Sequence, residues 1–215
     1  AITDDTDRPD LLILRRSDSA QLCRMPAFAT TADPASAGPD GVLIEGPAAT
    51  ENSIIAVDRG GTGTALVLVN TYGFEYPPFA VDGPAVPPGA PYAGGMTRID
   101  VRPDGSCAGR AWTSLARTAS LPKLTRGDGQ IHALAYGPAA PHPALRPVLD
   151  QGLGQKFGPV DVVSTDVENG RETARTFLGV APIDEPMELT GTIASRGHAP
   201  GVMWQPTLTR MLRVG

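Results

Sequence analysis

The stretch MTRIDVRPDGSCAGRAWTS, residues 96–114, predicts two β-strands joined by a tight turn. Apolar and β-branched residues recur in strand-length runs on both sides of Pro103-Asp104-Gly105. Proline, aspartate and glycine are the residue types that favour reversal of the chain. The stretch is therefore interpreted as a β-hairpin.

The same hairpin pattern occurs twice more in the chain. LLILRRSDSAQLCRM (residues 11–25) turns at Ser17-Asp18-Ser19, and VDVVSTDVENGRETARTFLG (residues 160–179) turns at Glu168-Asn169-Gly170. Repetition of one β-unit is typical of propellers and related all-β architectures. We expect an all-β fold, a β-propeller with about four blades in this chain.

Other segments predict further strands. Residues 53–58 and 65–70 flank a glycine-rich turn, residues 121–125 and 130–136 form another pair, and residues 188–194 and 202–214 supply the last strands. Two loops rich in proline and glycine, residues 77–95 and 137–158, separate these units. We expect one propeller domain over residues 1–215, or the C-terminal part of a larger one completed by an N-terminal segment or a partner protein.

Composition supports an all-β reading and excludes several classes of protein. The 215 residues include 25 Gly and 22 Pro, which suits short strands with frequent turns. The net charge of −5 is spread without a basic stripe, so nucleic acid is not an expected partner. No apolar run approaches the ~18 residues that a membrane-spanning helix needs, so we expect no transmembrane segment.

The two cysteines occupy corresponding places in two of the hairpins. Cys23 and Cys107 each follow the turn by a few residues, at the start of the second strand. They are interpreted as a disulfide, with two separate buried thiols as the alternative. A disulfide would favour a secreted or cell-envelope location.

A polar cluster is the candidate ligand site. If residues 53–58 pair with residues 65–70, Glu51 and Asn52 lie at the same end of that hairpin as Asn70 and Tyr72. A carboxylate, two amides and a phenol are suited to a small-ligand pocket or a channel mouth. Lys123 could add a positive charge there. The alternative is that Glu51 and Asn52 only cap turns.

The histidines, the oxygen-bearing residues near Gly170 and the tryptophans are interpreted as structural residues. His132 lies within a predicted strand, and His142 and His198 lie in loops, without metal-ligand spacing. The oxygen-bearing residues around Gly170 fit a hairpin turn better than a calcium loop. Trp112 and Trp204 lie in strand runs and are expected in the core. We predict no metal site, and no residue pattern identifies a cofactor.

Several segments together resemble a known group of proteins. AITDDTDRPDLLILRR, QLCRMPAF, ATENSIIAV, LVNTYGF and the stretch from Met96, followed by LPKL, are similar to uncharacterised secreted actinobacterial β-propeller proteins related to the quinoprotein-dehydrogenase-like (PQQ-like) superfamily. The resemblance covers most of residues 1–136. Both cysteines match Cys positions of that group, which implies the disulfide. Val69 stands where the group has an acidic residue, and no adjacent Cys-Cys pair exists for quinone binding.

These observations lead to one functional expectation and two alternatives. We expect a secreted β-propeller that binds a ligand or a partner protein, because no catalytic constellation is visible. The alternatives are a quinoprotein-like oxidoreductase with part of its cofactor site outside this chain, and a scaffold subunit of an envelope complex.

Overall fold

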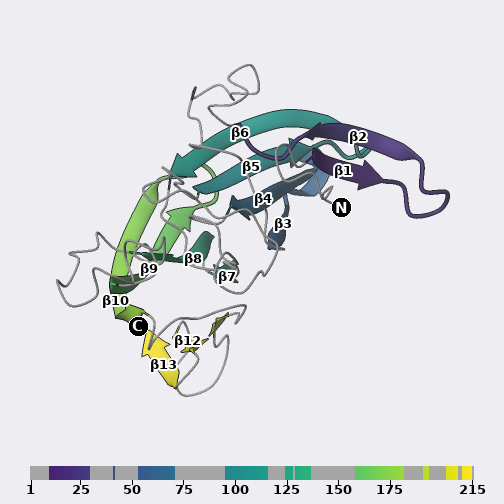
Figure 1. The fold of residues 1–215 in the computed structure, drawn as a ribbon. Coiled ribbons are helices and arrows are strands. Elements are labelled where there is room, and N and C mark those ends of the chain that lie inside the picture. Colours follow the sequence, from purple (N-terminus) through teal and green to yellow (C-terminus); the bar gives the residue numbers. More distant parts are fainter. Residues whose placement is uncertain are drawn as a thin grey trace, which may run out of the picture.

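The protein is seen here in a computed structural model, which describes residues 10–29, 41, 53–70, 95–115, 124–127, 129–136, 158–181, 191–193, 202–207 and 210–214. These residues form antiparallel sheets, with a single turn of 3-10 helix, η2 (Gly60–Thr62), in the part described. The prediction of an all-β fold is confirmed. Figure 1 shows the sheets following one another in an arc, in the order of the chain.

The first hairpin and the sheet after it come from the N-terminal half of the chain. Strands β1 (Asp10–Leu14) and β2 (Gln21–Pro26) form a two-stranded sheet. Strands β3 (Ile54–Asp58), β4 (Thr64–Asn70), β5 (Gly95–Val101) and β6 (Cys107–Leu115) form a four-stranded sheet in sequence order. Two predicted hairpins are thus joined in one up-and-down sheet through the β4–β5 pairing.

The C-terminal half repeats this arrangement. Strands β7 (Thr125–Gly127), β8 (Gln130–Tyr136), β9 (Gly158–Asp166) and β10 (Glu172–Ala181) form a second four-stranded up-and-down sheet. Strands β11 (Thr192–Ile193), β12 (Met203–Pro206) and β13 (Met211–Val214) form a three-stranded sheet. In Figure 1, β3 and β7 lie on the inner side of the arc, and β6 and β10 lie on its outer side.

The three quoted hairpins share one turn chemistry. In each, an Asx side chain precedes a residue of positive φ, and its Oδ1 accepts the backbone N–H two residues later. These acceptors are Asp18, Asp104 and Asn169, bonded to Ala20, Ser106 and Arg171 at 2.9–3.0 Å. Asp166 and Asn169 therefore serve the turn, as predicted, whereas the Glu168 carboxylate binds arginines of the neighbouring sheet.

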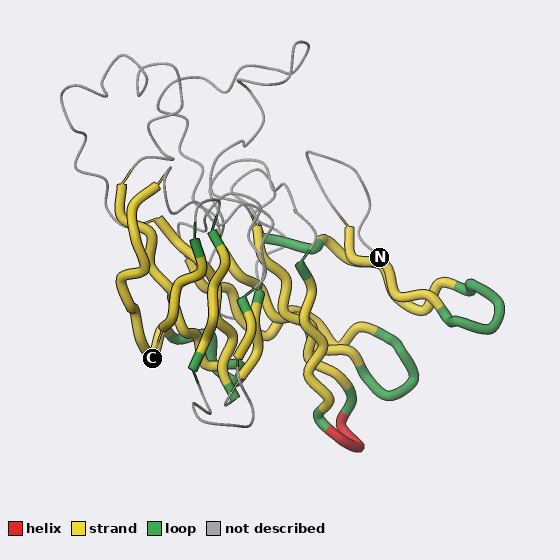
Figure 2. Tube along the Cα trace, turned by 90° about the horizontal axis from the view of Figure 1, so that it is seen from below, coloured by secondary structure: helices red, strands yellow, loops and turns green. Residues whose placement is uncertain are grey.

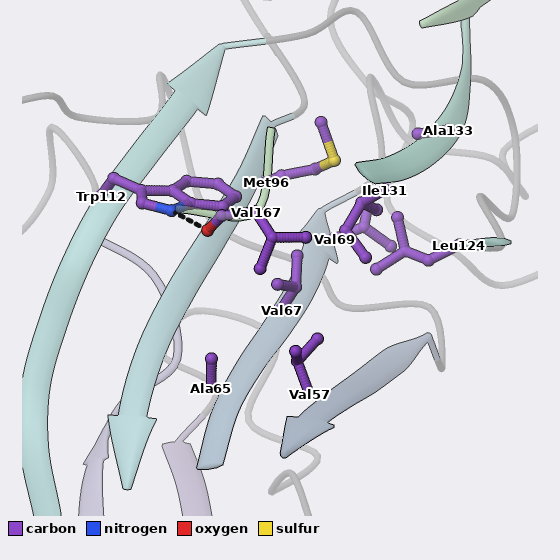
Figure 3. Packing of buried hydrophobic residues seen from close by; sticks show 10 residues of the cluster. All are labelled: Val57, Ala65, Val67, Val69, Met96, Trp112, Leu124, Ile131, Ala133 and Val167. Atoms are coloured by element: carbon purple, nitrogen blue, oxygen red, sulfur yellow. Dashed lines mark hydrogen bonds between the residues drawn. The ribbon is translucent and has the colours of Figure 1, made fainter. Parts of the chain in front are cut away.

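Three apolar clusters hold the sheets face to face. One lies between the two four-stranded sheets and includes Val67, Met96, Trp112 and Ile131 (Figure 3). A second joins the first hairpin to the opposite face of the β3–β6 sheet. The third joins the β7–β10 sheet to the β11–β13 sheet. Both faces of the central strands of each four-stranded sheet are therefore largely buried, which explains the near-continuous apolar runs in β4 and β8.

Candidate ligand site and the joints between sheets

A disulfide joins the outer strands of the first two sheets. Cys23 on β2 is bonded to Cys107 on β6, and their Cα atoms are 5.5 Å apart. The two positions correspond because both follow the same kind of turn, and this brings the outer strands of stacked sheets together. The predicted disulfide is confirmed, and the alternative of two separate thiols is wrong.

The candidate ligand residues lie mostly outside the described part of the chain. Glu51, Asn52, Tyr72 and Lys123 are not among the described residues, and Asn70 is described only in its backbone, as the last residue of β4. The pairing that the hypothesis needs is present: Ile54 is opposite Leu68, so the chain enters β3 and leaves β4 at the same end of the hairpin. The ligand site itself stays a prediction.

One contact brings the chain neighbours of two candidate residues together. The backbone N–H of Leu124 donates to Oγ of Ser53 at 2.8 Å. Ser53 directly follows Asn52, and Leu124 directly follows Lys123. This bond places the entry points of β3 and β7 next to each other. It also ties the start of one four-stranded sheet to the start of the next.

The same kind of contact recurs one sheet further along. Thr125 at the start of β7 donates its hydroxyl to the backbone carbonyl of Gly191 at 3.0 Å. A Cβ on Gly127 would meet the side chain of Ile193, so β7 and β11 lie close together. The first strands of consecutive sheets therefore form a continuous inner edge. In sequence, Glu51 and Asn52 precede β3, and Lys123 precedes β7.

A buried arginine fastens the two four-stranded sheets to each other. Arg98 on β5 is almost fully buried, and its Nη1 donates to the backbone carbonyl of Val167 at 2.8 Å and to Oε2 of Glu168 at 3.0 Å. Its Nε and Nη2 bind both carboxylate oxygens of Asp100. Arg59 adds bonds to the same two carboxylates. The joint is therefore a four-residue ion-pair network centred on Arg98.

The electrostatics of Arg98 explain why a charge is tolerated in this place. Burial acts to lower the pKa of its guanidinium, but hydrogen bonds and charges from Asp100 and Glu168 outweigh burial and raise the pKa above its ordinary value. Arg98 is thus held in the charged form. A buried cation that is fully paired fixes which turn docks against β5, in the manner of other buried polar contacts.

Trp112 completes the joint beside Arg98. Its indole Nε1 donates to the carbonyl of Val167 at 2.9 Å, which is the dashed line in Figure 3. The ring lies against Gly170 in the β9–β10 turn. Leu22 on β2 lies in the same way against Gly105 in the β5–β6 turn. Each sheet in this part of the chain therefore covers the turn glycine of the next sheet.

Trp204 differs from the prediction. Trp112 is buried as expected, but Trp204 is exposed on the face of the β11–β13 sheet that points away from the β7–β10 sheet. Met203 and Gln205, on either side of it, point inward and are buried. Strand alternation therefore places Trp204 outward. The presence of a tryptophan in a predicted strand therefore does not show that its side chain is buried in the hydrophobic core.

Among the described residues, the one histidine available for catalysis or metal binding is His132. His132 on β8 is half-buried, and its Nδ1 lies 2.9 Å from Oγ of Ser164 on the paired strand β9. His142 and His198 lie outside the described residues. No group of three His, Cys, Asp or Glu side chains that could hold a metal occurs in the described segments. Within those segments no helix is long and apolar enough to span a membrane.

Comparison with known proteins identifies no family for this chain. No protein-family model matches the chain, and neither a curated protein nor a solved structure matches it.

Proposed function

We propose that this chain forms consecutive blades of a β-propeller of the secreted or cell-envelope type, and that it binds a small polar ligand at the inner strand edge. The support for the propeller is the series of up-and-down sheets stacked face to face in chain order, with first strands inside and last strands outside. The Cys23–Cys107 bond supports an oxidising compartment.

The observation that carries the ligand site is the bond between Ser53 and Leu124. It joins the two segments that contribute Asn52 and Lys123. Inner strands of a propeller line its central channel, where ligands commonly bind. A carboxylate at Glu51, amides at Asn52 and Asn70, a phenol at Tyr72 and an ammonium at Lys123 would bind hydroxyl and carboxylate groups of a small molecule.

Bound small molecules in the purified protein test this proposal. Native mass spectrometry and absorbance of wild type should detect a polar organic molecule near one per chain. The double variant Asn52→Ala, Lys123→Ala should lose it, while the exposed control Arg171→Ala on the outer side should keep it. Wild type with nothing bound, or an unchanged double variant, would contradict the site.

The same measurement separates the proposed function from its rivals. A bound quinone would support a quinoprotein-like oxidoreductase instead of the proposed function. Dye-linked dehydrogenase activity after adding pyrroloquinoline quinone and Ca²⁺ would support the same alternative. A large complex that co-purifies and carries no small molecule would support a scaffold subunit.

A further inference from the structure

Asn169 and Gly170, in the turn between β9 and β10, form the one Asn-Gly pair of the chain. Such a pair is prone to deamidation, because glycine has no side chain to hinder attack by its backbone nitrogen on the asparagine Cγ. The N–Cγ bond forms, the Cγ–Nδ2 bond breaks, and Nδ2 leaves as ammonia with the proton of the attacking nitrogen. Water then opens the succinimide ring to aspartate or isoaspartate. Asn169 is exposed, so water can reach it.

The folded turn holds both reacting groups of this pair. The backbone N–H of Gly170 donates to the Asp166 carbonyl at 3.0 Å, so the attacking nitrogen is engaged through its proton. Oδ1 of Asn169 accepts the backbone N–H of Arg171 at 2.9 Å, which fixes the side chain. The backbone N–H of Asn169 donates to Oδ1 of Asp166 at 3.0 Å. Attack on Cγ therefore requires the turn to open.

The neighbouring sheet keeps this turn closed. The indole of Trp112 lies across Gly170, and its Nε1 donates to the Val167 carbonyl at 2.9 Å. Nη1 of Arg98 donates to the carbonyls of Val167 and Glu168 at 2.8 and 3.2 Å. These contacts hold the turn on both sides of the asparagine. Local opening of the turn therefore breaks contacts between the two four-stranded sheets.

The two products of deamidation differ in how they fit the turn. Asp18 and Asp104 occupy the place of Asn169 in the other two hairpins, and each accepts the corresponding backbone N–H through Oδ1. Aspartate at position 169 is therefore compatible with the turn. Isoaspartate lengthens the backbone by one methylene just before Gly170, which displaces the glycine from its place under Trp112.

We propose that Asn169 is a site of spontaneous deamidation, and that the joint between the two four-stranded sheets controls its rate. The asparagine is protected while the joint is closed, and it reacts when the turn opens. Molecules that form isoaspartate do not restore the joint, so each such event is an irreversible loss of native packing. None of the candidate ligand residues belongs to this turn, so the site is separate from the proposed function.

Peptide mapping by mass spectrometry, during incubation at mildly alkaline pH, tests the protection. The peptide that contains residue 169 gains mass when the amide becomes an acid, and chromatography separates its aspartate and isoaspartate forms. Native wild type should deamidate at Asn169 at least about tenfold more slowly than the same protein in urea. Equal rates in the two states, or no modification in urea, would overturn the proposal.

Two variants distinguish opening of this turn from loss of stability elsewhere. Trp112→Phe removes the indole donor to Val167, so it should raise the native rate at least about threefold. Ser53→Ala removes a bond at the start of β3, away from the turn, and should leave the native rate as in wild type. If both variants accelerate deamidation equally, the neighbouring sheet does not control the site.

The variant Asn169→Asp isolates the effect of the backbone change. It carries the same added charge as the deamidated protein but has a normal backbone, so it should unfold at a urea concentration close to that of wild type. Deamidated protein, separated from aged wild type by ion exchange, contains isoaspartate and should unfold at a lower concentration. Identical unfolding of the two samples would show that isoaspartate leaves the joint intact.

Discussion

The indole ring of Trp112 lies across Gly170, so one sheet is fastened by the turn of the next. A Cβ added at Gly170 would stand 2.6 Å from Cδ2 and 2.8 Å from Cε3 of the ring. The glycine also has a φ of 72°, which disfavours any other residue. A substitution at Gly170 would therefore cause both a steric clash with Trp112 and backbone strain.

Replacing Gly170 should lower the free energy of unfolding more than replacing a glycine whose substitution causes only backbone strain. Gly170→Ala should lower the free energy of unfolding by about 2–4 kcal/mol, since strain at positive φ adds to overpacking against Trp112. Gly129 has a φ of 74° with nothing within 4 Å of its Cβ, so Gly129→Ala should cost about 1 kcal/mol. Urea unfolding measures both variants. Equal losses would show that Trp112 does not press on the turn.

The hairpins were predictable because their information is local. Alternation and Asx turns lie within about twenty residues, and the bounds of β1, β2, β5 and β6 follow from them. The disulfide was predictable for a related reason, since Cys23 and Cys107 hold the same position after equivalent turns. Equivalent positions in stacked sheets come close in space.

The joints between sheets were not predictable in the same way. Arg98 alternates with apolar residues and therefore resembles an exposed charge, yet its partners Val167 and Glu168 lie about 70 residues away. Trp204 was misplaced because its exposure depends on which face of β12 is covered. Partners that meet only across sheets leave no signal in a local pattern.

Arg98 should be the most important charge of the described ion-pair network. Arg98→Met should lower the free energy of unfolding by about 3 kcal/mol or more, because it removes the buried cation that binds both oxygens of Asp100 and bridges them to the Val167 carbonyl and Glu168. Arg59 binds the same carboxylates from a more exposed position, so Arg59→Met should cost at most about 1 kcal/mol. Denaturant unfolding of the two variants gives the comparison. Similar losses would remove Arg98 from the centre of the joint.

The disulfide should contribute strongly to stability, because it closes a long loop. Its cysteines are 84 residues apart in sequence, and a loop of that length corresponds to roughly 4–5 kcal/mol in the chain-entropy model. The double variant Cys23→Ser, Cys107→Ser should lose stability of that order. Adding reductant should destabilise wild type and leave the double variant unchanged. A reductant effect on the variant would point to a cause other than this bond.

Acid should weaken the β5–β6 turn through Asp104. Its pKa lies below the ordinary value because the Ser106 hydroxyl and backbone N–H donate to its carboxylate. A depressed pKa adds stability above the ordinary Asp value of about 4, and that stability is lost as pH falls through the folded value. Asp104→Asn keeps an acceptor without titrating. The stability gap between wild type and variant should therefore narrow from pH 7 to pH 3, and a constant gap would refute this.

The bond from Leu124 to Ser53 should matter more than a similar bond on the surface. Ser53→Ala removes the side-chain acceptor of a part-buried N–H that joins two sheets, so it should cost about 1–3 kcal/mol. Thr62 donates its hydroxyl to the Arg59 carbonyl in an exposed turn, and Thr62→Ala should cost no more than about 0.5 kcal/mol. Unfolding curves measure both costs. If the inner edge positions Asn52 and Lys123, Ser53→Ala should also weaken retention of the bound small molecule, whereas Thr62→Ala should not. A destabilised Ser53→Ala variant that retains the molecule fully would separate the joint from the site.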